Sequence, residues 1–218
     1  MKIVYLVDVH GRFEAVPAAL RKIGDVDLLV VGGDITTAST PDDARRAIES
    51  WLPLAPRVAA VAGNMDSPEI DACLVDLGVA IDGGGLALDG VGVFGVSAAP
   101  YSPLHTPYEL SEDELAGRIA SAFESVRDCR VRIFCPHAPP HGTACDRLRS
   151  GEHVGSVAVR AFVDAEQPDV ALCGHIHEAR AMDEVGATRV ANPGPAALGH
   201  YAVVEIGETV AVELDPAT

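Results

Sequence analysis

Lysine is nearly absent from this sequence of 218 residues. Lys2 and Lys22 are the only lysines among 16 cationic residues, so the other 14 (16 − 2) are arginines, and 32 acidic residues bring the formal net charge to −16 at pH 7. Sequence-independent nucleic-acid binding is driven by Lys and Arg that neutralise phosphates, so this balance argues against it apart from a local basic patch. The composition is typical of proteins from salt-adapted organisms. A GC-rich genome would also favour arginine and alanine codons, but it leaves the excess of acids unexplained.

The chain also lacks a long apolar run. None approaches the roughly 20 residues that a membrane-spanning helix needs. The N-terminal apolar run, of about five residues, ends at Asp8 and is too short for the core of a signal peptide. We therefore expect a cytoplasmic protein with no membrane partner. No repeat, low-complexity segment or linker stands out, and the length and 48% apolar composition predict a single domain over residues 1–218.

The five cysteines are odd in number and show no Cys-x-x-Cys spacing. In a chain without an export signal, this pattern argues against a disulfide framework and against a thiolate metal site. Cysteine in an apolar context behaves as a small hydrophobic residue. We expect reduced cysteines with structural roles.

Apolar runs of strand length alternate with helical patterns through the first part of the chain. Strands are expected at residues 2–7, 27–33 and 57–62, and helices at residues 13–23 and 41–51. Such alternation implies a largely parallel sheet with right-handed crossovers. Ligands of these sheets bind beyond the carboxyl ends of the strands. The polar residues that follow each strand are therefore candidate site residues.

The later part of the chain combines a hairpin with further strands and helices. Asp89-Gly90 is typical of a tight turn, so we expect antiparallel strands on either side of it. Residues 99–110 contain three prolines and predict an irregular loop, a candidate wall of the site. Ser111 and Glu114 form a capping box that opens a helix to about residue 127. The other expected elements are strands at 131–135, 169–173, 188–191, 201–206 and 209–214 and a helix at 154–166.

Seven polar residues follow the apolar runs: Asp8, His10, Asp34, Asn64, His137, His175 and His177. Asp8 and His10 are two residues apart, so in a strand their side chains would leave the same face and could converge on one metal ion. Taken singly, Asp34 could cap a helix, Asn64 could be a turn residue, and His137 could be a hydrogen-bonded core histidine. All seven together favour a metal site.

Five short blocks carry a family resemblance. They are Asp8-x-His10, Gly33-Asp34, Gly63-Asn64-x-Asp66, His137 and Gly174-His175-x-His177, in this order. The set, which spans residues 3–177, resembles the calcineurin-like metallophosphoesterase superfamily, and Asn192-Pro193-Gly194 resembles a later segment of its smaller members. The resemblance implies an α/β fold with a central β-sandwich of two mixed sheets flanked by helices.

The resemblance also implies two divalent metal ions. Asp8, His10 and His177 would hold one, and Asn64, His137 and His175 the other, with Asp34 bridging them. These nitrogen and oxygen ligands suit Mn, our first choice, and also Fe, Ni, Co or Zn. Two ions roughly 3.5 to 4 Å apart can clamp a phosphoryl group and hold a bridging hydroxide as the nucleophile. Asp34 and Asn64 are therefore also predicted to be catalytic.

Met65 departs from the family pattern. Many phosphomonoesterases and cyclic-nucleotide phosphodiesterases of the superfamily have histidine at this position, where it can protonate the leaving oxygen, and a thioether cannot do so. Small prokaryotic and archaeal phosphodiesterases also lack that histidine, and the chain looks closer to them. Asp66 loses its usual histidine partner and is expected to have a structural role.

Other loop residues could contact the substrate. His141 and His153 follow His137 in the same loop and are candidate substrate contacts, with His141 also a candidate general acid; the alternative for each is a solvent-exposed histidine. Arg147 could meet a phosphate, as could Arg149, although solvated loop charges would look the same. His105 and His200 are expected to be structural.

The sequence therefore predicts a metal-dependent phosphoric ester hydrolase that cleaves small phosphodiesters rather than monoesters. A non-catalytic metal-binding scaffold that serves protein interaction is the alternative, although all seven ligand positions carry ligating residues. A nuclease of the same superfamily is disfavoured by the acidity, except on short oligonucleotides. A homo-oligomer is compatible with the sequence.

Overall fold

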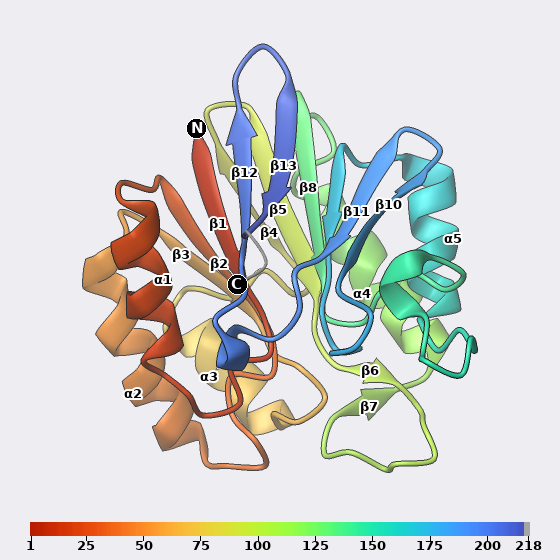
Figure 1. Cartoon of the computed structure of the whole chain (residues 1–218), viewed down its shortest axis with the longest axis horizontal. Coiled ribbons are helices and arrows are strands. Elements are labelled where there is room, and N and C mark those ends of the chain that lie inside the picture. Colours follow the sequence, from red (N-terminus) through yellow and green to blue (C-terminus); the bar gives the residue numbers. More distant parts are fainter. Residues whose placement is uncertain (216–218) are drawn as a thin grey trace.

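The computed structural model describes residues 1–215, which form two packed sheets with helices on both outer faces (Figure 1). The first sheet has the order β13-β12-β1-β2-β3, and the second has the order β10-β11-β9-β8-β5-β4. The strands of the first sheet are β1 (Lys2–Leu6), β2 (Leu28–Gly32), β3 (Val58–Val61), β12 (Ala202–Ile206) and β13 (Val210–Leu214). Those of the second are β4 (Gly85–Leu88), β5 (Val91–Val96), β8 (Val131–Pro136), β9 (Val170–Leu172), β10 (Ala181–Val185) and β11 (Thr188–Asn192).

Three apolar layers hold the sandwich together. Alternate residues of β1, such as Ile3 and Tyr5, point into the layer between the two sheets, while Val4 and Leu6 pack against helices on the outer face. These helices are α1 (Ala15–Ile23), α2 (Pro41–Trp51) and α3 (Pro68–Asp76). On the second sheet the outer layer is closed by α4 (Glu112–Glu124) and α5 (Val157–Glu166). The predicted fold class, two mixed sheets flanked by helices, is confirmed.

Strand direction determines where the polar residues gather. β1, β2 and β3 are parallel to one another, as are β5, β8 and β9, while β12, β13, β4 and β10 are antiparallel to their neighbours. The carboxyl ends of the parallel strands meet at one edge of the sandwich, the lower edge in Figure 1. Asp8, Asp34 and Asn64 follow strands of the first sheet, and His137 and His175 follow strands of the second. This edge therefore collects side chains from both sheets.

The structure differs from the sequence prediction at several elements. Helix α3 was not predicted, although Ser67 accepts a hydrogen bond as its N-cap and Pro68 occupies its first turn. Strand β10 was also missed because its sequence lacks apolar alternation: Met182 lies on the exposed face and Asp183 on the partly covered one. The expected irregular loop contains two short paired strands, β6 (Ala99–Pro100) and β7 (Glu109–Leu110). Helix α5 begins at Val157, after its cap Ser156, rather than at residue 154.

Several local features agree with the amino-acid sequence. Pro17 lies in the first turn of α1, where it costs no backbone hydrogen bond. The capping box of Ser111 and Glu114 is present at the start of α4. All five cysteines are free, as expected. Within residues 1–215, no helix combines the length and the apolar character that crossing a membrane requires.

Candidate metal centre

Asp8, His10 and His177 form one part of the candidate centre, which we call the outer cluster; its two histidines reach the surface, while Asp8 is fully buried. The Nε2 atoms of His10 and His177 lie 3.0 Å apart, and the His177 Nε2 atom lies 3.8 Å from the Asp8 carboxylate. One ligand atom from each of these residues and one from Asp34 all lie within 4.8 Å of one another. Such a group of imidazole and carboxylate atoms can hold a divalent cation.

Asn64, His137 and His175 form a second group, the inner cluster. The Asn64 Oδ1 atom lies 2.9 Å from the His137 Nε2 atom and 2.7 Å from the His175 Nδ1 atom. His137 is fully buried, and its Nδ1 atom lies 2.9 Å from the Gly32 carbonyl oxygen, which fixes the orientation of the ring. An imidazole held in this way by its other nitrogen is typical of metal-binding histidines.

Asp34 lies between the two clusters. Its Oδ2 atom is 3.6 Å from the His10 Nε2 atom, and its Oδ1 atom is 3.5 Å from the His137 Nε2 atom. The backbone N–H of Met65 donates a hydrogen bond of 2.7 Å to the Oδ1 atom. The two oxygens of one carboxylate therefore face different clusters.

The backbone at these positions is strained. Asp8, His10, Asp34 and His175 have φ between 49° and 66°, the left-handed region that non-glycine residues rarely adopt. The surrounding structure holds them there: the His10 N–H donates to the Asp34 carbonyl oxygen at 2.8 Å, and the His175 N–H donates to the Asp8 carboxylate at 3.1 Å. Gly33 is required because a Cβ atom there would approach the His137 Nδ1 atom to 2.6 Å. Strain of this kind concentrates at functional sites.

Burial shifts the protonation of the centre. It lowers the pKa of His10 and of His137 to about 4 and that of His175 to about 3, and neighbouring imidazoles add to the shifts of His10 and His175. These rings are neutral at pH 7 and present lone pairs. Burial also raises the pKa of Asp34 to about 7, although the Met65 N–H opposes the shift, and raises the pKa of Asp8 well above its usual range.

The residues present fit a divalent cation. The ion pairs of residues 1–215 give Asp8 and Asp34 only imidazole partners and no Lys or Arg. Neutral imidazoles cannot balance buried carboxylates, so both acids lack a counter-charge. A metal ion would supply that charge and take the lone pairs that the rings direct at one another.

Comparison with known proteins identifies the family. The family model for the calcineurin-like phosphoesterase superfamily domain matches residues 1–209. The chain belongs to this superfamily. The resemblance noted in the sequence is thus confirmed, and membership makes the chain a metal-dependent phosphoric ester hydrolase in general terms. An uncharacterized protein of Methanocaldococcus jannaschii is 32% identical over 202 residues, which cover 89% of this chain and 88% of that one.

Solved structures share the fold at low sequence identity. A protein of Thermus thermophilus superposes with a TM-score of 0.72 at 18% identity, covering 97% of each chain. A dimetal phosphatase of Danio rerio gives a TM-score of 0.62 at 12% identity, covering 98% of this chain and 95% of that one. At such identities the likeness concerns the fold alone.

Asp66 supports the centre of this superfamily member from behind. Its buried carboxylate accepts hydrogen bonds from the backbone N–H groups of Ile35, Thr36 and Gly63 and from the Thr36 hydroxyl, all between 2.9 and 3.0 Å. These donors lie beside Asp34 and Asn64 in the chain. The contacts agree with the structural role expected for Asp66.

A polar network that was not predicted from the sequence supports Asn64. The Tyr108 N–H donates to the Asn64 carbonyl oxygen at 3.0 Å, and the Tyr108 hydroxyl donates to Asp71 at 2.9 Å. Arg118 donates to Asp82 at 2.6 Å, to the Tyr108 hydroxyl at 2.8 Å and to Asp71 at 3.3 Å. The four side chains come from four separate segments, so no local sequence pattern could have revealed the network.

The structure brings the predicted substrate residues together. His141 and His153 have ring centroids 6.0 Å apart, and Arg147 pairs with His153 across a short antiparallel bridge. Arg149 instead lies 3.3 Å from Glu178 in an ion pair. His200 lies 3.2 Å from Asp215, as a structural histidine would. The roles of His141, His153 and Arg147 stay predictions.

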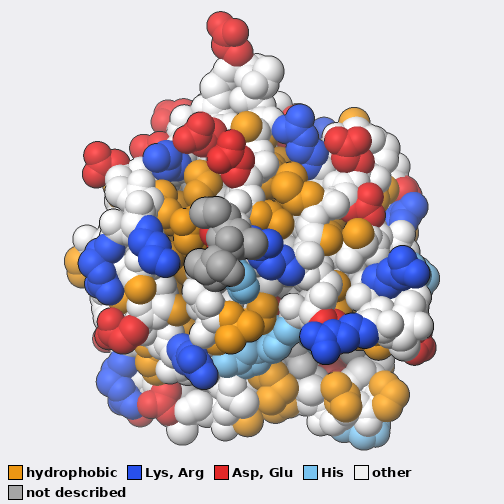
Figure 2. Space-filling view, in the orientation of Figure 1, with side chains coloured by type: hydrophobic (Ala, Val, Ile, Leu, Met, Phe, Trp, Pro, Cys, Tyr) orange, Lys and Arg blue, Asp and Glu red, His pale blue; other side chains and the backbone are white. Residues whose placement is uncertain are grey.

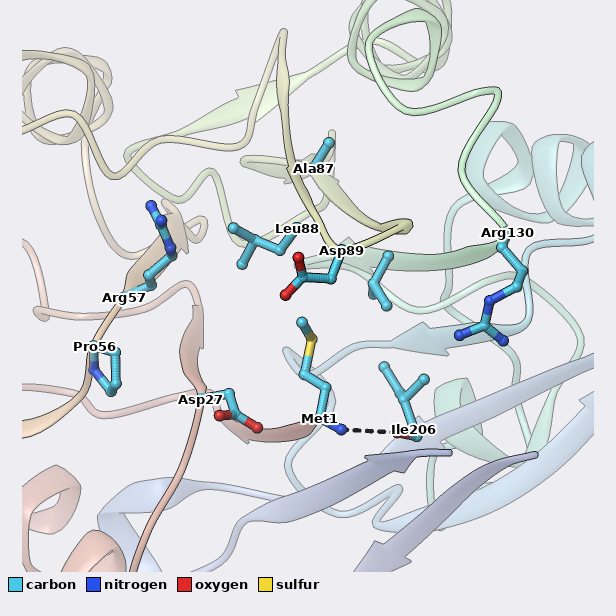
Figure 3. A pocket seen from close by; sticks show the side chains of 10 residues that line it. Met1, Asp27, Pro56, Arg57, Ala87, Leu88, Asp89, Arg130 and Ile206 are labelled. Atoms are coloured by element: carbon cyan, nitrogen blue, oxygen red, sulfur yellow. Dashed lines mark hydrogen bonds between the residues drawn. The ribbon is translucent and has the colours of Figure 1, made fainter. Parts of the chain in front are cut away.

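Two views show how the ends of the sandwich differ. Figure 2 shows a band of histidine side chains low on one face, with Lys or Arg on both sides of it. At the opposite end lies a hollow of about 650 Å³, whose lining includes Met1, Leu88, Asp89 and the arginines Arg57 and Arg130 on opposite walls (Figure 3). Met1, Arg57 and Arg130 lie just before the amino ends of parallel strands, Leu88 ends β4, and Asp89 lies in the turn before β5. The hollow contains no histidine and is remote from the centre.

Proposed function

We propose that the chain is a dinuclear metal-dependent phosphodiesterase. The observation that carries the proposal is the position of Asp34, whose two oxygens face the outer and the inner cluster at 3.6 and 3.5 Å. A carboxylate with this placement suits a bridge between two cations. A Danio rerio protein of the same fold is a dimetal phosphatase, which adds support.

Each cluster would hold one divalent ion, with Mn as the first choice and Fe, Ni, Co or Zn as alternatives. When bound, two such ions would supply Lewis-acid polarisation of a phosphoryl group and the attacking hydroxide. The chain's own residues fix the geometry: the Gly32 carbonyl orients His137, Tyr108 holds the Asn64 backbone, and the Met65 N–H holds Asp34. Prearranged ligands of this kind spare the reaction a reorganisation cost.

The preference for diesters rests on Met65. A thioether cannot donate a proton to a leaving oxygen, so substrates with good leaving groups are favoured. His141 is the residue that we assign to proton donation, with His153 and Arg147 as substrate contacts. Asp146 supports this assignment because its buried carboxylate accepts from the N–H groups of Gly142 and Gly155 and lies 2.6 Å from the His153 Nδ1 atom, which fixes the loop.

The test is hydrolysis of bis(p-nitrophenyl) phosphate and of p-nitrophenyl phosphate with Mn(II), at low and at molar salt. We expect the diester to be cleaved faster and Asp34→Ala to abolish cleavage. Asp128→Ala removes an exposed acid outside the centre and serves as the matched control. Full activity of Asp34→Ala would contradict the proposal.

The metal content of the same preparations separates the enzyme from the scaffold alternative. The enzyme requires two ions per chain together with hydrolysis. Fewer than two ions and no cleavage of any phosphoester would favour a protein-interaction role.

A further inference from the structure

A hollow of about 460 Å³ is lined by residues that follow two of the candidate metal ligands in the chain. Its lining includes Glu178 and Ala179, which follow His177 directly, and Gly142, which lies five residues after His137. Consecutive Cα atoms are about 3.8 Å apart, so its rim begins within one residue of the outer cluster. The loop that forms the other wall carries Arg147 and His153. The two segments that carry the ligands His137 and His177 thus also contribute residues to this hollow.

The acids of this hollow are already engaged. Glu178 accepts a 2.7 Å hydrogen bond from the Arg149 N–H and lies 3.3 Å from the Arg149 side chain. Asp183 accepts a 2.7 Å hydrogen bond from the Ala144 N–H. Arg180, a third arginine of the lining, is paired with Asp215 at 3.1 Å. Glu178 and Arg180 are thus paired with opposite charges, and Asp183 is held by a backbone N–H.

Arg147 and His153 are different. The ion pairs of the described chain, residues 1–215, leave Arg147 without an acidic partner. Residues directly opposite in an antiparallel pair have Cβ atoms about 5 Å apart on the same side, and Arg147 and His153 are such partners. The Nδ1 atom of His153 lies 2.6 Å from Asp146, which leaves the Nε2 atom to share a hydrogen bond with a ligand. An unpaired guanidinium beside an oriented imidazole suits a phosphate group.

We propose that this hollow binds a second phosphate group of the substrate, so that the enzyme prefers phosphodiesters carrying a further phosphate. The inference rests on the proposed function, since it takes the first phosphate to be bound at the metal centre. Its specific feature is a cationic contact in a chain of net charge −16, where a bare anionic substrate would otherwise be repelled.

The test is calorimetric binding to the Mn(II)-loaded protein, with thymidine 3′,5′-bisphosphate compared with the 5′- and 3′-monophosphates. A charge-assisted contact to phosphate predicts that the bisphosphate binds about 10- to 100-fold more tightly than either monophosphate. Arg147→Ala should remove most of this advantage. Arg127→Ala, which removes an exposed arginine paired with Glu124 on α4, should retain it.

Equal affinities for the bisphosphate and the monophosphates would overturn the inference, as would an advantage that survives in Arg147→Ala. The hydrolysis of bis(p-nitrophenyl) phosphate, which has one phosphate, separates this result from the proposed function. Hydrolysis without a bisphosphate advantage rejects the second-phosphate site alone. An advantage without hydrolysis rejects the phosphodiesterase and leaves the site in place.

Discussion

The inner and outer clusters differ in how firmly the fold holds them. In the inner cluster, His137 is fully buried and Asn64 is 4% exposed, whereas in the outer cluster the side chains of His10 and His177 are 19% and 48% exposed. The Gly32 carbonyl orients the inner His137, but the outer His10 relies on the exposed Thr37, whose hydroxyl lies 3.0 Å from its Nδ1 atom. His137 and Asn64 are therefore part of the core, as is Asp8 of the outer cluster, whereas His10 and His177 are the side that substrate can approach.

Removing one histidine from each cluster gives the largest expected contrast. His137→Ala leaves a cavity and an unpaired Gly32 carbonyl, and should lower the free energy of unfolding of the metal-free protein by about 2 to 4 kcal/mol. His177→Ala removes a half-exposed ring and should change it by less than about 0.5 kcal/mol. Denaturant unfolding in the presence of a chelator measures both values. Equal losses would refute the contrast between the clusters.

Replacing Arg118 tests the support of the inner cluster. Arg118→Met removes the partner of the largely buried Asp82 and should cost about 1 to 3 kcal/mol of unfolding free energy. Because Tyr108 then loses a hydrogen bond, we expect weaker binding of one ion only, seen as a second, lower-affinity step in Mn(II) titrations. Arg127→Met is the control. Equal weakening of both Mn(II)-binding steps would show that the network does not support the inner cluster specifically.

Thr37 offers the corresponding test of the outer cluster. Thr37→Val removes the hydroxyl beside the His10 Nδ1 atom and should weaken one Mn(II) step by about 10-fold, the lower end for partners of metal-binding histidines. Thr37→Ser keeps the hydroxyl and should restore the affinity. Since Thr37 is exposed, the melting temperature of the metal-free protein should stay unchanged in both variants. A drop in the melting temperature would show that the outer cluster also contributes to the core.

The pH dependence of Mn(II) binding is the smallest expected effect. It distinguishes a carboxyl ligand that must release a proton from histidines that are already neutral. The pKa of Asp34 is raised to about 7, so this carboxyl holds a proton in the metal-free protein at pH 6 and must release it when a cation binds. Asp34 alone predicts a rise in Mn(II) affinity of up to about 10-fold between pH 6 and 7, and Asp8, whose pKa is also raised, adds to the proton release. His10 and His137, with pKa values of about 4, are already neutral and release none. Calorimetry in buffers of different ionisation enthalpy counts the protons.

The sequence allowed prediction of features that depend on neighbours along the chain. Each parallel strand is a short apolar run that ends in a polar residue, and the strand order brings these ends together, so the convergence of Asp8, Asp34 and His137 followed from local patterns. The strained φ values of Asp8 and Asp34 did not follow, because they result from contacts between strands. Helix α3 was missed even though Ser67 and Pro68 signal its start.

Contacts between distant segments were beyond prediction. Arg118 reaches Asp71 across 47 residues, and the packing of α3, α4 and the β6–β7 segment alone decides that meeting. Asp146 similarly orients His153 through a loop conformation that no periodic pattern encodes. Sequence spacing identified which residues could act, while the positions of the residues supporting them required the folded chain.

The origin of the ligands on two sheets has a mechanical consequence. Asn64 and Asp8 come after strands of the first sheet, and His137 and His177 come after strands of the second. The layer between the two sheets is otherwise apolar. An ion in either cluster would cross-link the two sheets at one edge of the sandwich. Ligand binding to the native state adds stability in proportion to the logarithm of ligand concentration. Removal of the metal would thus loosen the contact between the two sheets at that edge. Amide hydrogen exchange should accelerate there first.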